Sequence, residues 1–266
     1  MGENKNFFEG PLFTITNYIM WLFIGNIYFA LCNLPLIYIL FLIPSAGSDF
    51  TNNFVSYIPI MFLCLIPIGP SITALLSVMG KLVREKDINL TKDYFKAYKA
   101  NFKQSTLLWI FTLIVIVILS VDLYYFRTHS SNVVIRYLFL ILIFIVIIMT
   151  LYTFPILSRF YMKSKDVIRL SYYYAIAKFK TTFVNILCVL FCFIAITKMR
   201  FFILFISTGI CYLIMLNENK LLKEIEEKLE SSDKKEEKKI SEAEEVTEKI
   251  ASDEDEDKDN EDNEDR

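Results

Sequence analysis

Side chains able to do chemistry are few in this sequence, and their spacing favours packing over catalysis. The one histidine, His129, stands in a short loop and cannot form a metal site alone. All five cysteines lie inside apolar runs; Cys188 and Cys192 are four residues apart, but no histidine or carboxylate joins them as a ligand. Buried thiols of this kind behave as small apolar side chains. We therefore expect no catalytic residues, no metal, no cofactor and no enzyme activity.

A break in an apolar run is the second feature that could carry chemistry. Residues 54–83 form a run in which Pro67 and Pro70 remove backbone donors and Gly69 loosens the turn between them. Carbonyls freed at membrane depth must find partners in protein or in a water-filled cavity. We expect Asn33, in the preceding run, to lie close to this break. The candidate polar site comprises Asn33, Pro35, Gly69, Pro70, Ser71 and Thr73.

Two interpretations of this break stay open. Discontinuous helices form ion or substrate sites in some transporters. Alternatively, the break is a proline kink packed against the Asn33-Leu34-Pro35 stretch of the first run, since such kinks are tolerated in membrane helices.

Two basic, aromatic segments are the third feature. Residues 81–103 carry seven Lys or Arg and residues 159–180 carry six, with aromatic residues interleaved at helical spacing. Basic amphipathic helices of this kind lie at the membrane interface over anionic lipid headgroups, and a partner-docking surface is the alternative. FKTT at 179–182 echoes FKQS at 102–105, which suggests an internal repeat. The candidate lipid-facing surface comprises Lys92, Lys96, Lys99, Lys103, Lys178 and Lys180.

Six long apolar runs must position these features. The chain of 266 residues is 55% hydrophobic, and we place the runs at residues 12–43, 54–83, 105–125, 133–160, 182–197 and 199–216. The sequence thus predicts an all-α, polytopic membrane protein with about six transmembrane helices and two basic amphipathic interfacial helices. Because basic residues concentrate in the second and fourth loops, we expect these helices and both termini on the cytoplasmic side.

Charge is segregated along the chain. Residues 218–266 hold 22 acidic and 10 basic residues, a formal charge of −12, whereas the remaining 8 acidic and 18 basic residues give +10. We expect a membrane domain over residues 1–222 and an acidic, largely disordered cytoplasmic tail over residues 223–266, because the tail lacks apolar surface to bury.

Three motifs in order resemble the YesL-like family of bacterial multi-pass membrane proteins. They are NLP at residues 33–35, IGPSITAL at 68–75 and FKAYKANFKQS at 95–105, and the resemblance extends over about residues 7–222. The chain departs from the shortest members by an insertion over roughly residues 36–66. The resemblance implies a bacterial plasma-membrane protein of unknown function associated with carbohydrate uptake systems, and it supplies no catalytic residues.

Two functions remain in view. The resemblance and the basic segments favour a non-catalytic accessory protein linked to carbohydrate uptake, with lipid headgroups and a sugar transporter complex as partners and no nucleic acid. The alternative is a facilitator or transporter for a small neutral solute, supported by the broken run. Ion-coupled transport is disfavoured because none of the six runs carries a charged residue at its middle.

Overall fold

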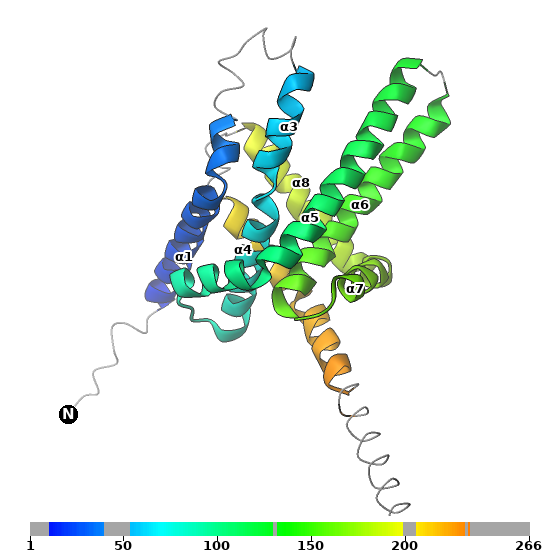
Figure 1. Ribbon diagram of the computed structural model, residues 1–266. Helices are drawn as coiled ribbons and strands as arrows, with labels where there is room; N and C mark the ends of the chain where they lie inside the picture. The colour runs from blue at the N-terminus through cyan, green and yellow to red at the C-terminus, as the bar shows by residue number, and fades with distance from the viewer. Residues whose placement is uncertain (1–10, 40–53, 130–131, 199–205, 232–233, 235–266) are drawn as a thin grey trace, which may run out of the picture. The chain divides into compact units, whose positions relative to one another are not determined.

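The structure, a computed structural model, describes residues 11–39, 54–129, 132–198, 206–231 and 234, and this part of the chain is helical with no strand (Figure 1). It divides into two compact units, of which the first ends at Asn219 and the second begins at Lys220. The helices of the first unit are α1 (Pro11–Cys32), α3 (Phe54–Leu65), α4 (Ile68–Glu85), α5 (Leu90–His129), α6 (Val133–Arg159), α7 (Ser164–Ala177) and α8 (Phe179–Lys198). Residues 34–39 and 206–231 are also helical.

Several of these helices have the length and composition of membrane spans. Four qualify alone, within residues 15–32, 59–85, 90–129 and 133–159, and the bent pair formed by α7 and the first part of α8 brings the number to as many as five. The sixth expected span, over residues 199–216, lies partly outside the described residues. The described chain is therefore that of an all-helical, membrane-embedded protein.

The best-buried helix of the first unit is α4. It contacts α1, α5 and α6, and its side chains at Ala74, Leu75 and Met79 are fully buried. Gly80 faces the methyl end of the Met215 side chain, which occupies the space that a Cβ at this position would need. The helix ends at Lys86, which adopts the left-handed conformation with φ 61° and donates its backbone N–H to the Leu82 carbonyl at 2.9 Å.

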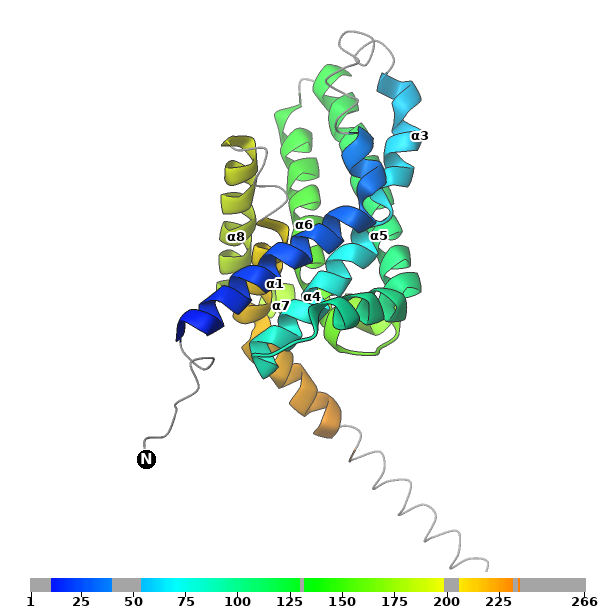
Figure 2. The same ribbon diagram turned by 90° about the vertical axis from the view of Figure 1, so that its left-hand side faces the viewer.

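One continuous helix, α5, combines the first basic segment with the third apolar run. Its 40 residues would extend about 60 Å, twice the roughly 30 Å of a bilayer's hydrocarbon core. Figures 1 and 2 show its first turns lying across the ends of the other helices before the chain turns and rises. The hydroxyl of Ser105 donates to the Asn101 carbonyl at 2.7 Å, a type of bond that bends helices.

The second basic segment forms α7, and α7 meets α8 at 97°. Each basic segment contains a four-residue connection, 86–89 before α5 in the first case and 160–163 before α7 in the second. The two segments differ in how they join the next apolar run. The first continues into it as one helix, α5, whereas in the second α7 ends at Ala177 and α8 begins at Phe179. Gln104 of α5 donates from its side-chain amide to the carbonyl of Met162, in the second connection, at 2.7 Å.

The first helix packs on the last helix of this unit through an amide. The Oδ1 of Asn26 accepts the backbone N–H of Thr208 at 3.0 Å, which caps the start of the helical residues 206–219. The two backbones come close, since a Cβ on Gly25 would lie 2.9 Å from the Cγ2 of Thr208. Asn26 thus makes the cross-helix bond expected of an uncharged amide in a span.

The second unit begins within the same helix, which continues to residue 231. The acidic stretch over residues 235–266 lies outside the described residues, so the disordered tail stays a prediction.

Candidate functional site

The break in the second apolar run lies at Ile66 and Pro67. There α3 ends at Leu65 and α4 begins at Ile68, about one turn before the Gly69-Pro70 pair on which the sequence argument centred. Pro70 therefore falls in the first turn of α4, where backbone N–H groups have no acceptor within the helix. A proline at this position removes no helical hydrogen bond. Pro67 has no N–H for the Leu63 carbonyl, and the N–H of Ile66 bonds that carbonyl instead at 3.3 Å.

Local hydroxyls bond two carbonyls at the break, as the sequence suggested. The Ser71 hydroxyl donates to the Pro67 carbonyl at 2.6 Å, and the Thr73 hydroxyl donates to the Gly69 carbonyl at 2.9 Å. Both hydroxyl-bearing residues are fully buried. The Pro67 carbonyl also accepts the backbone N–H of Ser71 at 3.1 Å, so the Ser71 hydroxyl adds a second bond at the break.

A residue that the sequence did not single out completes the break. Trp109 of α5 donates from its indole Nε1 to the Leu65 carbonyl at 2.8 Å. Gly69 makes this approach possible, because a Cβ at that position would lie only 2.5 Å from the Cβ of Trp109. The indole ring also meets Phe154 of α6, with ring centroids 5.8 Å apart. Trp109 therefore holds α3, α4, α5 and α6 together at one point.

Asn33 is buried at the turn between α1 and the helical residues 34–39, so the interruption expected before Pro35 is present. Its side-chain amide donates to the Phe29 carbonyl of α1 at 2.8 Å, and its Oδ1 has no hydrogen-bond partner in the described part of the chain. Tyr94 of α5 is also fully buried, and its hydroxyl has no hydrogen-bond partner among the described residues.

The predicted lipid-facing lysines lie in two groups. Lys92, Lys96, Lys99 and Lys103 are exposed on the first turns of α5, and Lys180 is exposed at the start of α8. Lys178, half-buried, stands between α7 and α8. Protein covers part of the opposite face of the α5 segment: Leu90 and Tyr94 are buried, and the Tyr94 ring lies 5.7 Å from that of Tyr28 in α1.

A cavity of about 210 Å³ lies between α4, the first turns of α5 and the end of α6; we call it the α4–α5–α6 cavity. Among the predicted lysines described, only Lys96 lines it. Its charged lining residues are Lys81, Arg84, Asp93, Lys96 and Arg159. Lys81 bonds the Oδ2 of Asp93 at 2.9 Å, and the same oxygen accepts the backbone N–H of Asn89 at 3.2 Å. Asp93 thereby fixes Lys81 and the start of α5.

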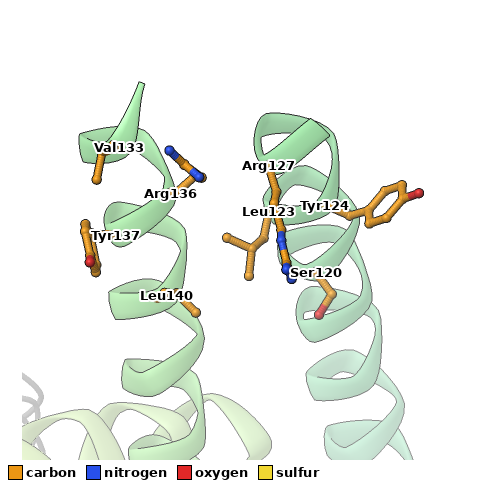
Figure 3. A pocket seen from close by; sticks show the side chains of 8 residues that line it. All are labelled: Ser120, Leu123, Tyr124, Arg127, Val133, Arg136, Tyr137 and Leu140. Carbon is orange, nitrogen blue, oxygen red and sulfur yellow. The ribbon is translucent and has the colours of Figure 1, made fainter. Parts of the chain in front are cut away.

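A second opening, of about 430 Å³, lies between α5 and α6 near the tip of their hairpin. Figure 3 shows Arg127 of α5 and Arg136 of α6 reaching into it, with Leu123 beside them and Tyr124 turned away. Its lining residues come from two adjacent helices only, and Val133 and Leu140 make part of this lining apolar. The α4–α5–α6 cavity is the stronger candidate because three helices supply its four cationic side chains.

A buried carboxyl is the other feature that the sequence argument missed. Glu218 follows the apolar run ending at residue 216 and is fully buried. Its Oε1 accepts from the Asn185 side chain at 2.5 Å, while its Oε2 has no partner among the described residues. Asn217 bonds the Asn185 Oδ1 at 2.8 Å. Burial raises the pKa of the Glu218 carboxyl well above its usual range, although the Asn185 bond opposes the shift.

Among the described residues, no group of three or more His, Cys, Asp or Glu side chains is placed to hold a metal ion. His129 lies at the end of α5, where its ring stacks on Tyr125 with centroids 4.7 Å apart.

Comparison with known proteins reaches only the first part of the chain. A family model described as "Protein of unknown function, DUF624" matches residues 13–123, less than half of the sequence. The matched region runs from α1 into α5 and includes the three motifs, the break and Trp109. No curated protein and no solved structure matches the chain. The chain is thus similar to an uncharacterised domain family.

Proposed function

We propose that this protein is a non-catalytic membrane accessory protein of the YesL-like type, linked to carbohydrate uptake, that docks a transporter complex through its basic cytoplasmic face. The observation that carries the proposal is the placement of its two basic segments. The first turns of α5 and the whole of α7 lie at the same end of the first unit in both ribbon views (Figures 1 and 2). Gln104 of α5 bonds the carbonyl of Met162, in the connection before α7. A membrane protein with one basic end has a surface suited to anionic lipid headgroups and to acidic partner segments.

The proposal includes six spans in the bacterial plasma membrane with both termini in the cytoplasm. Support comes from the same views, in which α1 starts, and the helical residues 206–219 finish, toward the end that carries α7. A start and a finish at the basic end agree with the positive-inside rule. The two basic segments act in this proposal as interfacial helices.

Cysteine accessibility tests the threading. The five native cysteines are first replaced, and single cysteines are then introduced as Ser48→Cys and Ser231→Cys. In intact cells an impermeant thiol reagent should modify the first variant and spare the second until the membrane is permeabilised. Labelling of the Ser231→Cys variant from outside would overturn the proposed orientation.

Crosslinking followed by pull-down from native membranes tests the accessory role. The expected result is a transporter subunit recovered in constant ratio with the wild-type chain. A quadruple variant, Lys92→Gln with Lys99→Gln, Lys103→Gln and Lys180→Gln, should lose that subunit while still inserting into the membrane. Retention of the partner by this variant would exclude the basic face as the docking surface.

The second candidate, a facilitator for a small neutral solute, rests on the broken span. Trp109, Ser71 and Thr73 already bond three carbonyls at the break, which leaves fewer groups for a solute and ranks this function second. Solute uptake into liposomes that contain only the purified protein would favour it over the accessory role.

A further inference from the structure

The opening between α5 and α6 near the tip of their hairpin carries positive charge with no carboxylate beside it; we call it the α5–α6 opening. Its lining includes Arg127 and Arg136 and no acidic residue, so the formal charge of the lining is +2. Asp122, the acidic residue nearest to both arginines in the sequence, does not line the opening. In the α4–α5–α6 cavity, which more helices line, Asp93 already pairs with Lys81 at 2.9 Å.

The position of Arg136 is unfavourable unless an anion lies near it. Its Nε is buried and has no hydrogen-bond partner in the described part of the chain, although buried donors are as a rule bonded. Arg136 is also the fourth residue of α6, and the N-terminal end of a helix carries partial positive charge. The first turn of α6 contains no acidic residue that would offset the repulsion. An anion bound in the opening would give the Nε an acceptor and remove this repulsion.

Arg127 extends toward the same space from the facing helix (Figure 3). It belongs to the last turn of α5, where a cation offsets the partial negative charge of the helix terminus, so its position alone requires no ligand. Two like charges that share one opening nevertheless repel each other, and an anion between them replaces that repulsion with two attractions. The two arginines together therefore favour a bound anion more than either does alone.

We propose that the α5–α6 opening binds a phosphate group through Arg127 and Arg136. Arginine forks bond phosphate oxygens in pairs, and these hydrogen bonds are strengthened by charge. The hydroxyl of Ser120, which also lines the opening, offers one further donor. The volume of about 430 Å³ falls within the range of roughly 300–1,000 Å³ typical of small-molecule sites, so a phosphate headgroup has room there.

Two sources can supply this group, a lipid headgroup and a soluble phosphate. The lipid is favoured because apolar side chains continue along both helices: Val121 of α5 and Leu138 and Ile141 of α6 are each more than half exposed. The acyl chains of a lipid would lie along these side chains while its phosphate meets the arginines. The hairpin tip points away from α7 in both ribbon views, so under the proposed threading this lipid belongs to the outer leaflet (Figures 1 and 2).

Arginine variants of the full-length protein test the site. Arg136→Gln and Arg127→Gln each remove one lining cation, whereas Lys99→Gln removes an exposed cation of α5 that does not line the opening. Without added ligand, Arg136→Gln should be at least as stable as the wild type in thermal unfolding, because it removes a cation from the positive end of α6. Arg136→Lys keeps the charge and loses the fork, and it decides the question if Arg136→Gln does not fold.

Binding is measured in two arms. In the first, inorganic phosphate is titrated against the protein in phosphatidylcholine nanodiscs. In the second, phosphatidylglycerol, with phosphatidylcholine for comparison, is added to the protein in neutral detergent and counted by native mass spectrometry. We expect Arg136→Gln and Arg127→Gln each to weaken Kd about tenfold, which corresponds to about 1.4 kcal/mol. Arg136→Lys should weaken Kd about threefold, and Lys99→Gln should remain within about twofold of the wild type on the same scale.

The arm that shows the difference identifies the source. A loss confined to phosphatidylglycerol supports the lipid, a loss confined to inorganic phosphate supports a soluble ligand, and a loss in both supports a site that accepts either. If the wild type binds neither probe, or if the arginine variants bind as Lys99→Gln does, the site does not exist. The inference goes beyond the accessory role and does not depend on it, because the purified protein is measured without a partner.

Discussion

Trp109 and Leu65 are joined by a 2.8 Å hydrogen bond from the indole Nε1 to the backbone carbonyl. This bond reaches from the middle of α5 to the last residue of α3, immediately before the break. A carbonyl left without a donor in hydrocarbon would cost several kcal/mol, so a side chain from another helix makes the discontinuity stable.

Replacing Trp109 by Phe should destabilise the protein by about 1 kcal/mol, since interhelical bonds in membranes have this magnitude. The phenyl ring keeps most of the contact with Phe154 but cannot donate to Leu65. Thermal unfolding in detergent measures the effect. Trp21→Phe is the matched control, because Trp21 is also a buried tryptophan in an apolar helix, α1. Equal losses in the two variants would show that ring size and not the bond matters.

Gly69→Ala tests the close approach that permits this bond. The new Cβ would lie 2.5 Å from the Cβ and 2.8 Å from the Cγ of Trp109, atoms near the backbone that cannot swing away. We expect a loss of about 1–3 kcal/mol, typical of overpacking. Gly209→Ala is the control, and we expect it to raise the free energy of unfolding. Its Cβ would meet nothing within 4 Å, and alanine stabilises a helix by up to about 1 kcal/mol over glycine. A stable Gly69→Ala variant would contradict the role assigned to this glycine.

Features that depend on local sequence were predictable. The apolar run expected over residues 133–160 is α6, Val133–Arg159, because its composition permits only a helix and Asn132 caps its start by accepting the Val134 N–H at 3.1 Å. The interruption at Asn33 likewise follows from Pro35. The hydroxyls of Ser71 and Thr73 bond carbonyls only four residues away, so the sequence alone pointed to them.

Features that depend on distant partners were not predictable. The break lies at Ile66 and Pro67 and not at the Gly69-Pro70 pair. Pro70 lies in the first turn of α4, where its missing N–H removes no helical hydrogen bond. Trp109 is 44 residues from Leu65, and no periodicity connects them. Glu218 was counted with the charge of the residues that follow it and was not singled out, yet Asn185, 33 residues earlier, gives it a buried partner.

The Asn33→Leu variant distinguishes a hydrogen bond from Asn33 to another helix from the bond within α1 that the structure has. A cross-helix bond would make this change cost about 1 kcal/mol. In the structure the Asn33 amide donates to Phe29 within its own helix, and the Phe29 carbonyl keeps the backbone N–H of Asn33 at 3.2 Å. We therefore expect no loss, or a gain of up to about 1 kcal/mol, since an unpartnered Oδ1 leaves the interior. Asn26→Leu, which breaks the bond to Thr208, should lose about 1 kcal/mol in the same assay. A reversed order of the two variants would contradict this assignment.

The buried carboxyl of Glu218 should make stability depend on pH. Burial raises its pKa in the folded protein, so the folded state binds a proton that the unfolded state has already released. The free energy of unfolding therefore falls as pH rises from about 4.3, the ordinary pKa of Glu, up to the raised folded value. The slope in that window is at most about 1.4 kcal/mol per pH unit.

Glu218→Gln removes this titration while keeping the shape of the side chain and an oxygen for Asn185. Thermal unfolding of the two proteins between about pH 5 and about pH 8 should show the wild type losing stability relative to the variant as pH rises. Glu85→Gln is the control, because Glu85 is 55% exposed and its removal leaves no buried group behind. The difference between wild type and the Glu85→Gln variant should stay nearly constant over the same range. Parallel curves for wild type and the Glu218→Gln variant would mean that Glu218 reaches solvent and is not held in the protonated form by burial.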